Sequence, residues 1–172
     1  MEQDDEQIID VLIAIDAETI VSQLGTNTDP DNPAQVTDAS LIYMVTKQAD
    51  VMAGNAGNEL NIKAETEDII RWRETSLSLN SDYVGILYSF QQTGGGDQLI
   101  SPPTPLQATV TTPLPNPADP LHPTTQQIEN YFWETTVLNP GTVTYHFKFM
   151  IIDRHSKVLG YYWWDPFITI SA

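Results

Sequence analysis

The most regular feature of the chain is an alternation of apolar and polar residues near its C-terminus. Val143, Tyr145, Phe147, Phe149 and Ile151 occupy every second position of their segment. Successive side chains of a β-strand point to opposite faces of a sheet, so this spacing places all five on one face. The pattern predicts a half-buried strand. It excludes an amphipathic helix here, because the apolar stripe of a helix repeats about every 3.6 residues.

Other segments carry the same alternation or are rich in β-branched and aromatic residues. The segment 127–138 also fits a short helix, but its aromatic and β-branched content favours a strand. In 69–79, Ile70 and Trp72 have one parity and Leu77 and Leu79 the other, which predicts a β-bulge near Glu74 to Ser76. We expect further strands at these ranges: 9–15, 41–47, 69–79, 83–90, 127–138, 158–164 and 167–170.

Turn residues separate these segments. The sequence shows no convincing amphipathic helix that is longer than two turns. About eight short strands of this kind are typical of an all-β fold, here an antiparallel β-sandwich of jelly-roll or immunoglobulin-like type.

Two stretches depart from this pattern within what we expect to be a single domain spanning residues 1–172. The acidic residues 1–7 are predicted to be disordered. Residues 102–123 hold eight of the twelve prolines. Because proline lacks the N–H that a ladder needs, this range is predicted to be a loop or an edge strand over the surface and not a central strand.

The charge of the chain restricts its partners. There are 23 acidic and 7 basic residues, giving a net charge of −16, and no lysine or arginine lies between Glu74 and Phe147. A contiguous basic footprint is therefore absent, which disfavours nucleic acid and anionic membranes as partners. Repulsion between copies should weaken as the pH falls towards the sequence pI of about 4.1, so self-association should depend on pH.

The sequence also bears on localisation. It contains no cysteine, which removes disulfides and thiolate zinc sites. The N-terminus is acidic where a secretory signal needs positive charge, and no stretch approaches the length of a membrane span. We expect a cytoplasmic protein without a signal peptide, with unconventional export left open.

One loop offers candidate metal ligands. Asp29, Asp31 and Asn32 supply several oxygen atoms within four residues, as a hard cation such as calcium would need. The spacing and terminal glutamate of an EF-hand are missing. Turns built on Asx and proline residues explain the same sequence without a metal, and we favour that interpretation.

One aromatic run is a candidate ligand or partner surface, namely Tyr161, Tyr162, Trp163 and Trp164. On a half-buried strand, one Tyr/Trp pair would join the core and the other would face outwards. Exposed aromatic rings of this kind stack on sugars or on a partner protein.

No catalytic machinery or cofactor site is recognisable, and we predict that the protein is not an enzyme. His122, His146 and His155 lie far apart and form no metal spacing. No serine lies in a nucleophile-elbow context, and Gly94 to Gly96 neither precedes a lysine nor opens a helix. Arg71 and Arg73 most simply pair with carboxylates. Paired acids could serve a hydrolase, but 23 acidic residues make such proximity uninformative.

Several stretches taken in order resemble the PixA/AidA family of bacterial inclusion-body proteins. They are Ile8–Asp16, Tyr43–Ala49, Asp68–Arg73, Ser101–Pro103 and Gly160–Pro166. The resemblance implies a small protein of Gram-negative bacteria that accumulates in the cytoplasm, in some cases as crystalline inclusions. It also implies quorum-sensing or growth-phase control in bacteria that interact with nematodes or other hosts. No catalytic residue of the family can be carried over.

Two hypotheses follow. The first is a non-enzymatic structural or storage protein that self-assembles, with its solubility set by carboxylate charge. The second is a lectin-like module that presents outward aromatic rings to a carbohydrate or a host protein, with a cation held at Asp29 and Asp31.

Overall fold

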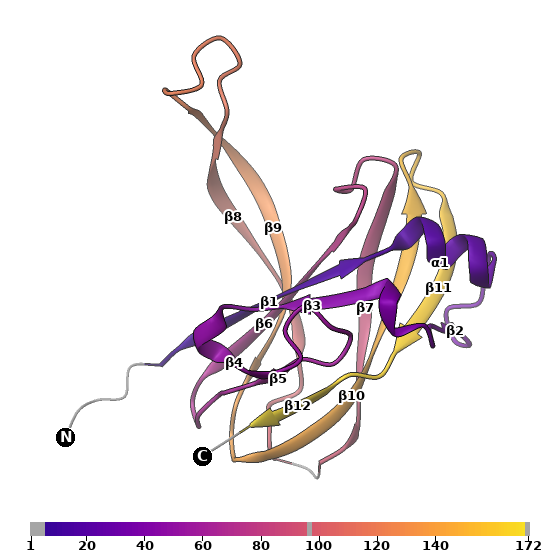
Figure 1. The fold of residues 1–172 in the computed structure, drawn as a ribbon, viewed down its shortest axis with the longest axis vertical. Coiled ribbons are helices and arrows are strands. Elements are labelled where there is room, and N and C mark those ends of the chain that lie inside the picture. The colour runs from indigo at the N-terminus through magenta and orange to yellow at the C-terminus, as the bar shows by residue number, and fades with distance from the viewer. Residues whose placement is uncertain (1–5, 96–97, 171–172) are drawn as a thin grey trace.

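The computed structural model describes residues 6–95 and 98–170, and it is mostly β. Two five-stranded sheets share one core (Figure 1). Sheet A has the order β3 (Ile42–Val45), β1 (Ile8–Ile15), β6 (Ile69–Ser76), β9 (Thr124–Thr136), β8 (Thr104–Leu114). Sheet B comprises β7 (Tyr83–Gly94), β10 (Gly141–Asp153), β11 (Val158–Trp164), β12 (Phe167–Ile170) and β2 (Ala34–Gln35). The predicted all-β sandwich class is confirmed.

Short elements complete the chain. β4 (Val51–Ala53) pairs with β5 (Asn61–Ile62), and the 3₁₀ turns are η1 (Ala39–Leu41) and η2 (Gln48–Asp50). The helix α1 (Ala17–Leu24) begins at Asp16, whose side chain accepts a hydrogen bond from the Thr19 N–H at 3.2 Å. In the part of the chain that the structure describes, no helix is long and apolar enough to cross a membrane.

Period-two burial builds the core as the sequence predicted. Alternate residues of β10 from Val143 to Ile151 are fully buried, and so are Ile9, Ile13 and Ile15 of β1. Between the sheets, Trp72 lies 5.5 Å from Phe147 and 5.9 Å from Tyr145, measured between ring centroids. Aromatic pairs at such distances add stabilisation beyond the burial of their area.

The pairing of β1 with β6 is parallel, with Ile8 opposite Ile69 and Ile15 opposite Ser76. Sheet A is therefore mixed, because its other pairs are antiparallel. Parallel neighbours need a long crossover connection, and here the chain passes through α1, β2, β3, β4 and β5 between the two strands.

The predicted bulge near Glu74 to Ser76 is wrong. The β1–β6 register runs without a shift to Ser76, where β6 ends. Leu77 and Leu79 lie in the following turn and are 53% and 85% exposed. Leu79 and Asn80 adopt left-handed backbone conformations there, with φ of 53° and 59°. The apparent change of parity came from counting exposed turn leucines as strand residues.

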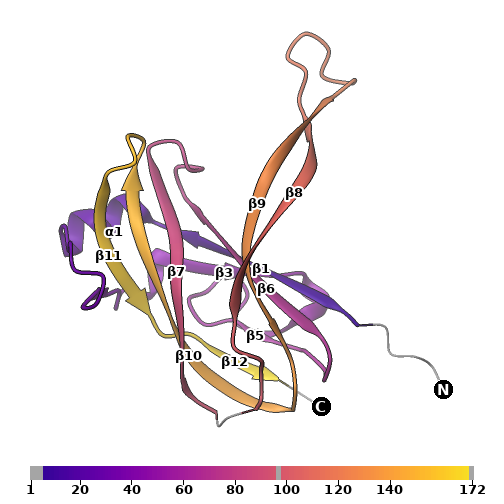
Figure 2. The same ribbon diagram turned by 180° about the vertical axis from the view of Figure 1, so that it is seen from behind.

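The proline-rich range forms the edge strand β8 and the loop that follows it. β8 pairs with β9 from Thr104 opposite Glu134 to Leu114 opposite Thr124, whereas β6 pairs with β9 over Trp133 to Thr136. From Trp133 back towards Thr124, β9 and its partner β8 leave the sandwich together. They form a twisted ribbon that points away from the rest of the molecule (Figures 1 and 2). We call residues 105–132 the arm. Residues 1–5 of the acidic N-terminus lie outside the described residues. Gly96, the last residue of the glycine run that begins at Gly94, lies outside them as well.

Candidate functional site

The aromatic run at the end of β11 divides between the core and the surface. Tyr162 is fully buried and Trp164 is 3% exposed, whereas Tyr161 and Trp163 are half-buried on the outer face of sheet B. Trp164 packs on Phe147 and Phe149, with ring centroids 5.6 Å apart in both pairs. The outward pair is therefore Tyr161 and Trp163.

Neighbouring side chains enlarge this outward pair into an aromatic cluster. The Trp163 ring lies 4.3 Å from the His146 ring, and Tyr161 meets Tyr88 edge-on at 5.6 Å. Partial burial lowers the pKa of His146, which favours the neutral form of its ring. We call Tyr88, His146, Tyr161 and Trp163 the aromatic cluster. Its flat, uncharged rings suit stacking on an apolar face of a ligand.

The loop that carries Asp29 and Asp31 lies beside this cluster. The Tyr88 hydroxyl donates to the Pro30 carbonyl at 3.0 Å, and the Tyr161 N–H donates to the Asn27 carbonyl at 2.9 Å. Burial, together with the neighbouring Tyr161 phenol and the carboxylates of Asp31 and Asp29, raises the pKa of Tyr88 to about 12. The structure thus places the candidate metal loop at Asp29 beside the candidate aromatic surface at Tyr161 and Trp163, although the two lie far apart in the sequence.

Within the loop, the Asp29 carboxylate is engaged by its own neighbours. Oδ1 accepts from the Asp31 N–H at 2.9 Å, and Oδ2 accepts from the Asn32 side-chain amide at 2.8 Å. These bonds lower the pKa of Asp29, the one from the Asn32 side chain most. They form the Asx turn considered for this sequence. Over residues 6–95 and 98–170, no three His, Cys, Asp or Glu side chains group to hold a metal ion.

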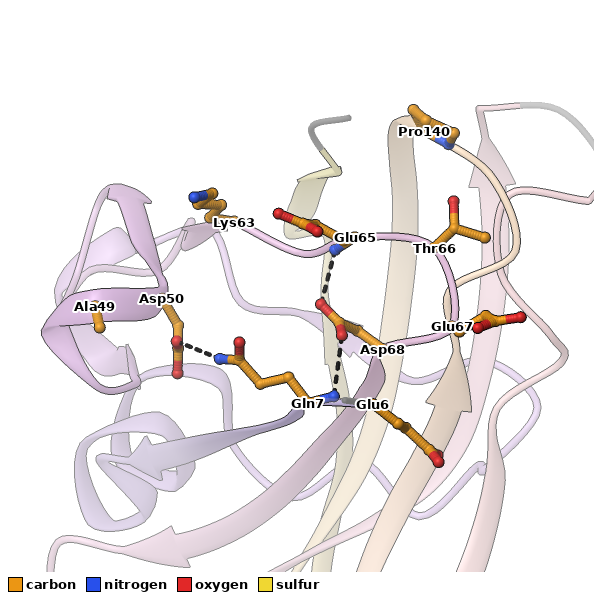
Figure 3. Close-up of a pocket in the computed structure, with 10 residues that line it drawn as sticks. All are labelled: Glu6, Gln7, Ala49, Asp50, Lys63, Glu65, Thr66, Glu67, Asp68 and Pro140. Atoms are coloured by element: carbon orange, nitrogen blue, oxygen red, sulfur yellow. Dashed lines mark hydrogen bonds between the residues drawn. The ribbon is translucent and has the colours of Figure 1, made fainter. Parts of the chain in front are cut away.

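A second candidate site is an acidic hollow of about 560 Å³ at one end of the sandwich (Figure 3). Asp50 and Asp68 are 3% and 8% exposed. Asp68 accepts from the Gln7 N–H at 3.1 Å and the Glu65 N–H at 2.7 Å, and Asp50 accepts from the Gln7 amide at 2.7 Å. Both carboxylates therefore fix Gln7, the residue that directly precedes β1. Ten residues line the hollow: Glu6, Gln7, Ala49, Asp50, Lys63, Glu65, Thr66, Glu67, Asp68 and Pro140.

Sequence reasoning did not find this hollow, because its acids come from separate segments. The Oδ2 atom of Asp50 is buried and has no hydrogen-bond partner among the described residues. The five acidic residues that line the hollow outnumber its one basic residue, Lys63, so the hollow favours neutral or cationic groups over anions. The one available signal was the position of Asp68 directly before β6.

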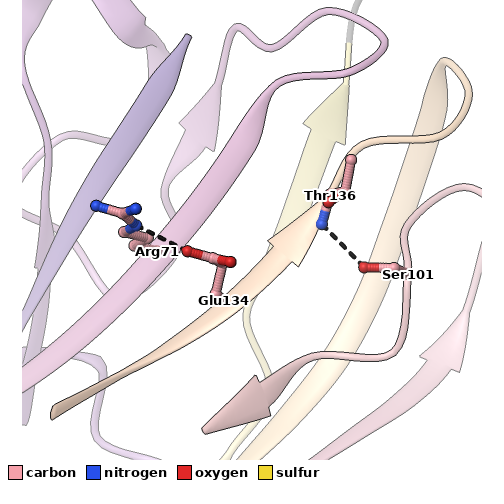
Figure 4. A network of polar contacts seen from close by, with 4 residues as sticks. All are labelled: Arg71, Ser101, Glu134 and Thr136. Carbon is pink, nitrogen blue, oxygen red and sulfur yellow. Dashed lines mark hydrogen bonds and ion pairs between the residues drawn. The ribbon is translucent and has the colours of Figure 1, made fainter. Parts of the chain in front are cut away.

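On the outer face of sheet A, Arg71 and Glu134 form an ion pair across β6 and β9 (Figure 4). The Arg71 Nε lies 2.9 Å from the Glu134 Oε2, and the guanidinium lies 4.8 Å from the Phe132 ring centre. In the same view, the Thr136 N–H donates to the Ser101 hydroxyl at 2.9 Å. Pairing of Arg71 with a carboxylate agrees with the simplest interpretation of its sequence, whereas Arg73 is exposed.

On the inner face, Glu74 points into a hollow of about 410 Å³ where β9 leaves β6. Its Oε1 accepts from the Leu87 N–H at 3.3 Å. Burial raises the pKa of Glu74 to about 7. Its parity with Ile70 and Trp72 was the signal that could have placed it inside.

The three histidines lie on separate elements and share no site. His122 pairs with Asp119 at 2.8 Å near the end of the arm, and His155 contacts Arg154 in the β10–β11 turn. His146 belongs to the aromatic cluster, and none of the three lines the acidic hollow.

The sequence profile of the family described as "PixA: Inclusion body protein" matches residues 7–170. The chain belongs to the PixA inclusion body protein family. The crystal structure of an inclusion body protein (PixA) from Burkholderia cenocepacia J2315 superposes on this PixA-family chain with a TM-score of 0.82. The match covers 99% of each chain at 21% sequence identity, so it shows a shared fold. No curated protein matches this PixA-family chain. The resemblance to PixA proteins that the sequence indicated is confirmed.

Proposed function

We propose that this chain is a non-enzymatic structural or storage protein that self-assembles into cytoplasmic inclusions, and that carboxylate charge controls its solubility. Membership of the inclusion body family carries the proposal. The net charge of −16 supplies the control, since like-charged copies repel one another at neutral pH. Regulation by quorum sensing and a part in host interaction belong to this proposal through the resemblance.

The arrangement of the acids supports charge control. Asp50 and Asp68 are engaged in fixing β1, and Asp29 fixes its own loop. Most other carboxylates are exposed. Exposed acids titrate together as the pH falls, so repulsion between copies should decline over a broad range above the pI of about 4.1.

Light scattering and sedimentation of the purified chain from pH 8 to pH 4 test this proposal. We expect growing association as the pH falls, and association at pH 7 when salt is raised, because salt screens exposed charges. Salt should have little effect near the pI, where there is little net charge to screen. A chain that stays monomeric throughout, at high concentration and with divalent cations present, would contradict the proposal.

A lectin-like function is a second candidate, and the aromatic cluster favours it. Tyr161 and Trp163 face outwards next to the Asp29 loop, which gives a carbohydrate both stacking rings and polar groups. A glycan array in calcium and in chelator tests it, with Trp163→Ala expected to lose binding and Trp163→Phe to keep part of it. Equal signals from the wild type and Trp163→Ala would exclude this surface.

A further inference from the structure

The arm is a two-stranded ribbon that contacts the rest of the described chain near its base, through Tyr131 and Phe132. For residues 124–132 of β9, the ladder partners among the described strands come from β8. Every residue of β8 is exposed or half-buried. A two-stranded hairpin standing alone is marginally stable in water, so a ribbon of this length gains stability from a covering surface.

The two faces of the arm differ in polarity. Even-numbered positions of β8 lie on one face, where Val110 stands opposite Ile128 and Leu106 stands opposite Phe132. On the other face, the Gln107 amide and the Thr109 hydroxyl both donate to the Glu129 carboxylate, at 3.1 and 2.6 Å. We call this face the apolar arm face after Leu106, Ala108, Val110, Leu114 and Ile128. Thr112, Thr124, Gln126 and Asn130 lie on it between them.

The apolar arm face continues the outer face of sheet A. Trp133 points into the core, so its neighbour Phe132 points outwards, where the Arg71 guanidinium lies over its ring. The polar face of the arm instead continues the inner face. Near the base of the arm that face meets β7, where the Tyr131 hydroxyl donates to the Leu87 carbonyl at 3.0 Å. A face turned away from the core and yet apolar, with Leu106 39% exposed, indicates a contact surface.

Charge favours a second copy of this chain as the occupant. Residues 102–128 contain one acid, Asp119, and no lysine or arginine, in a chain of net charge −16. Asp119 is itself paired with His122. At the base of the arm, Arg71 and Arg73 lie on the same outer face, where the carboxylates of Glu134 and Asp10 lie near them. The outer part of the arm carries almost no net charge, so another acidic copy meets little repulsion on this surface.

We propose that the apolar arm face packs against the same face of a second copy, with Val110 and Ile128 near a two-fold axis. An isologous contact of this kind is self-complementary, so each substitution acts twice. The inference rests on the proposed self-assembly and names its contact surface.

Two variants with the same added charge test the proposal by sedimentation under conditions where the wild type associates. Val110→Glu places a carboxylate on the apolar arm face, and Thr111→Glu places one on the opposite face of the same strand. We expect Val110→Glu to weaken association at least about tenfold, and Thr111→Glu to behave like the wild type. Val110→Thr, which keeps the β-branched shape, should give an intermediate loss and guards against misfolding of the arm.

A cysteine-free chain also allows a direct measurement, since one introduced thiol reports alone. With a thiol-reactive label, Val110→Cys should react at least about tenfold more slowly in the associated state than in the monomer. Thr111→Cys should react equally in both states. Equal labelling of both variants, or association of Val110→Glu as strong as that of the wild type, would overturn the arm contact and leave the proposed function standing. A wild type that never associates would overturn both.

Discussion

The Glu74 Oε1 accepts a hydrogen bond from the Leu87 N–H at 3.3 Å, which ties β6 of one sheet to β7 of the other. The second oxygen, Oε2, is buried and without a partner among the described residues. Arg73, Glu129 and Tyr131 are the titratable neighbours that line the same hollow. An acid held in this way is stable when protonated and costly when charged.

Glu74 should therefore make the fold more stable at mildly acidic pH. Burial raises its pKa from 4.5 to about 7 in the folded chain. Its contribution is fully present below 4.5 and is lost as the pH rises through about 7. Over this pH range the free energy of unfolding should decrease by an amount on the order of 3 kcal/mol. Urea unfolding at pH 5 and pH 8 should show this difference in the wild type and a much smaller one in Glu74→Gln.

Glu129→Gln is the matched control, because Glu129 lines the same hollow but is exposed. It should keep the pH difference of the wild type. The lowered pKa values of Asp29, Asp38 and Asp153 act below 3.8, outside this window. If the unfolding free energies of Glu74→Gln and the wild type differed by the same amount at pH 5 and pH 8, the buried acid would not cause the pH dependence of stability.

The two tryptophans of β11 should differ in their effect on stability. Trp164 is 3% exposed and packs on two phenylalanines, so Trp164→Ala should cost about 3–5 kcal/mol of unfolding free energy. Trp163 is half-buried, so Trp163→Ala should cost about 1–2 kcal/mol. Denaturant unfolding followed by far-ultraviolet circular dichroism measures both. Equal losses would mean that the alternation along β11 does not set burial.

Residue type and local alternation were enough to predict most of the longer strands and the core, but not the short strands β2, β4 and β5. The spacing from Val143 to Ile151 identified β10, and the spacing within Tyr161 to Trp164 predicted that one aromatic pair faces inwards. Both follow from the fixed two-residue period of a strand. The same counting failed at Leu77 and Leu79, because exposed apolar residues in a turn have no period.

Contacts between distant segments could not be predicted from these patterns. The parallel pairing of β1 with β6 and the position of the Asp29 loop beside Tyr88 depend on which strands meet. The arm is a case of the same kind. The prolines of residues 102–123 indicated an edge strand or a loop, but an edge strand can lie on the body or leave it.

The ion pair between Arg71 and Glu134 should contribute little to stability by itself. Its side chains are 31% and 24% exposed, and partly exposed pairs contribute roughly 0–1 kcal/mol. A double-mutant cycle with Arg71→Ala and Glu134→Ala should give a coupling energy below about 1 kcal/mol that shrinks in high salt. Arg71→Ala alone should cost more than Glu134→Ala, because it also removes the contact with Phe132. A large coupling that salt does not change would contradict this.

Asp68 should be the most important acid for the stability of the fold. It is 8% exposed and accepts from the backbone N–H groups of Gln7 and Glu65, which joins β1 to the segment before β6 (Figure 3). Asp68→Ala leaves both donors without their acceptor, at about 1–3 kcal/mol each, and Asp68→Asn, which keeps one oxygen acceptor, should cost less. Glu65→Ala removes the same charge from an exposed side chain of the same hollow and should change stability by less than about 0.5 kcal/mol. Chemical denaturation at pH 7 ranks the three variants. A Glu65→Ala loss equal to that of Asp68→Ala would mean that the net charge of the hollow, and not the hydrogen bonds to Asp68, stabilises this end of the sandwich.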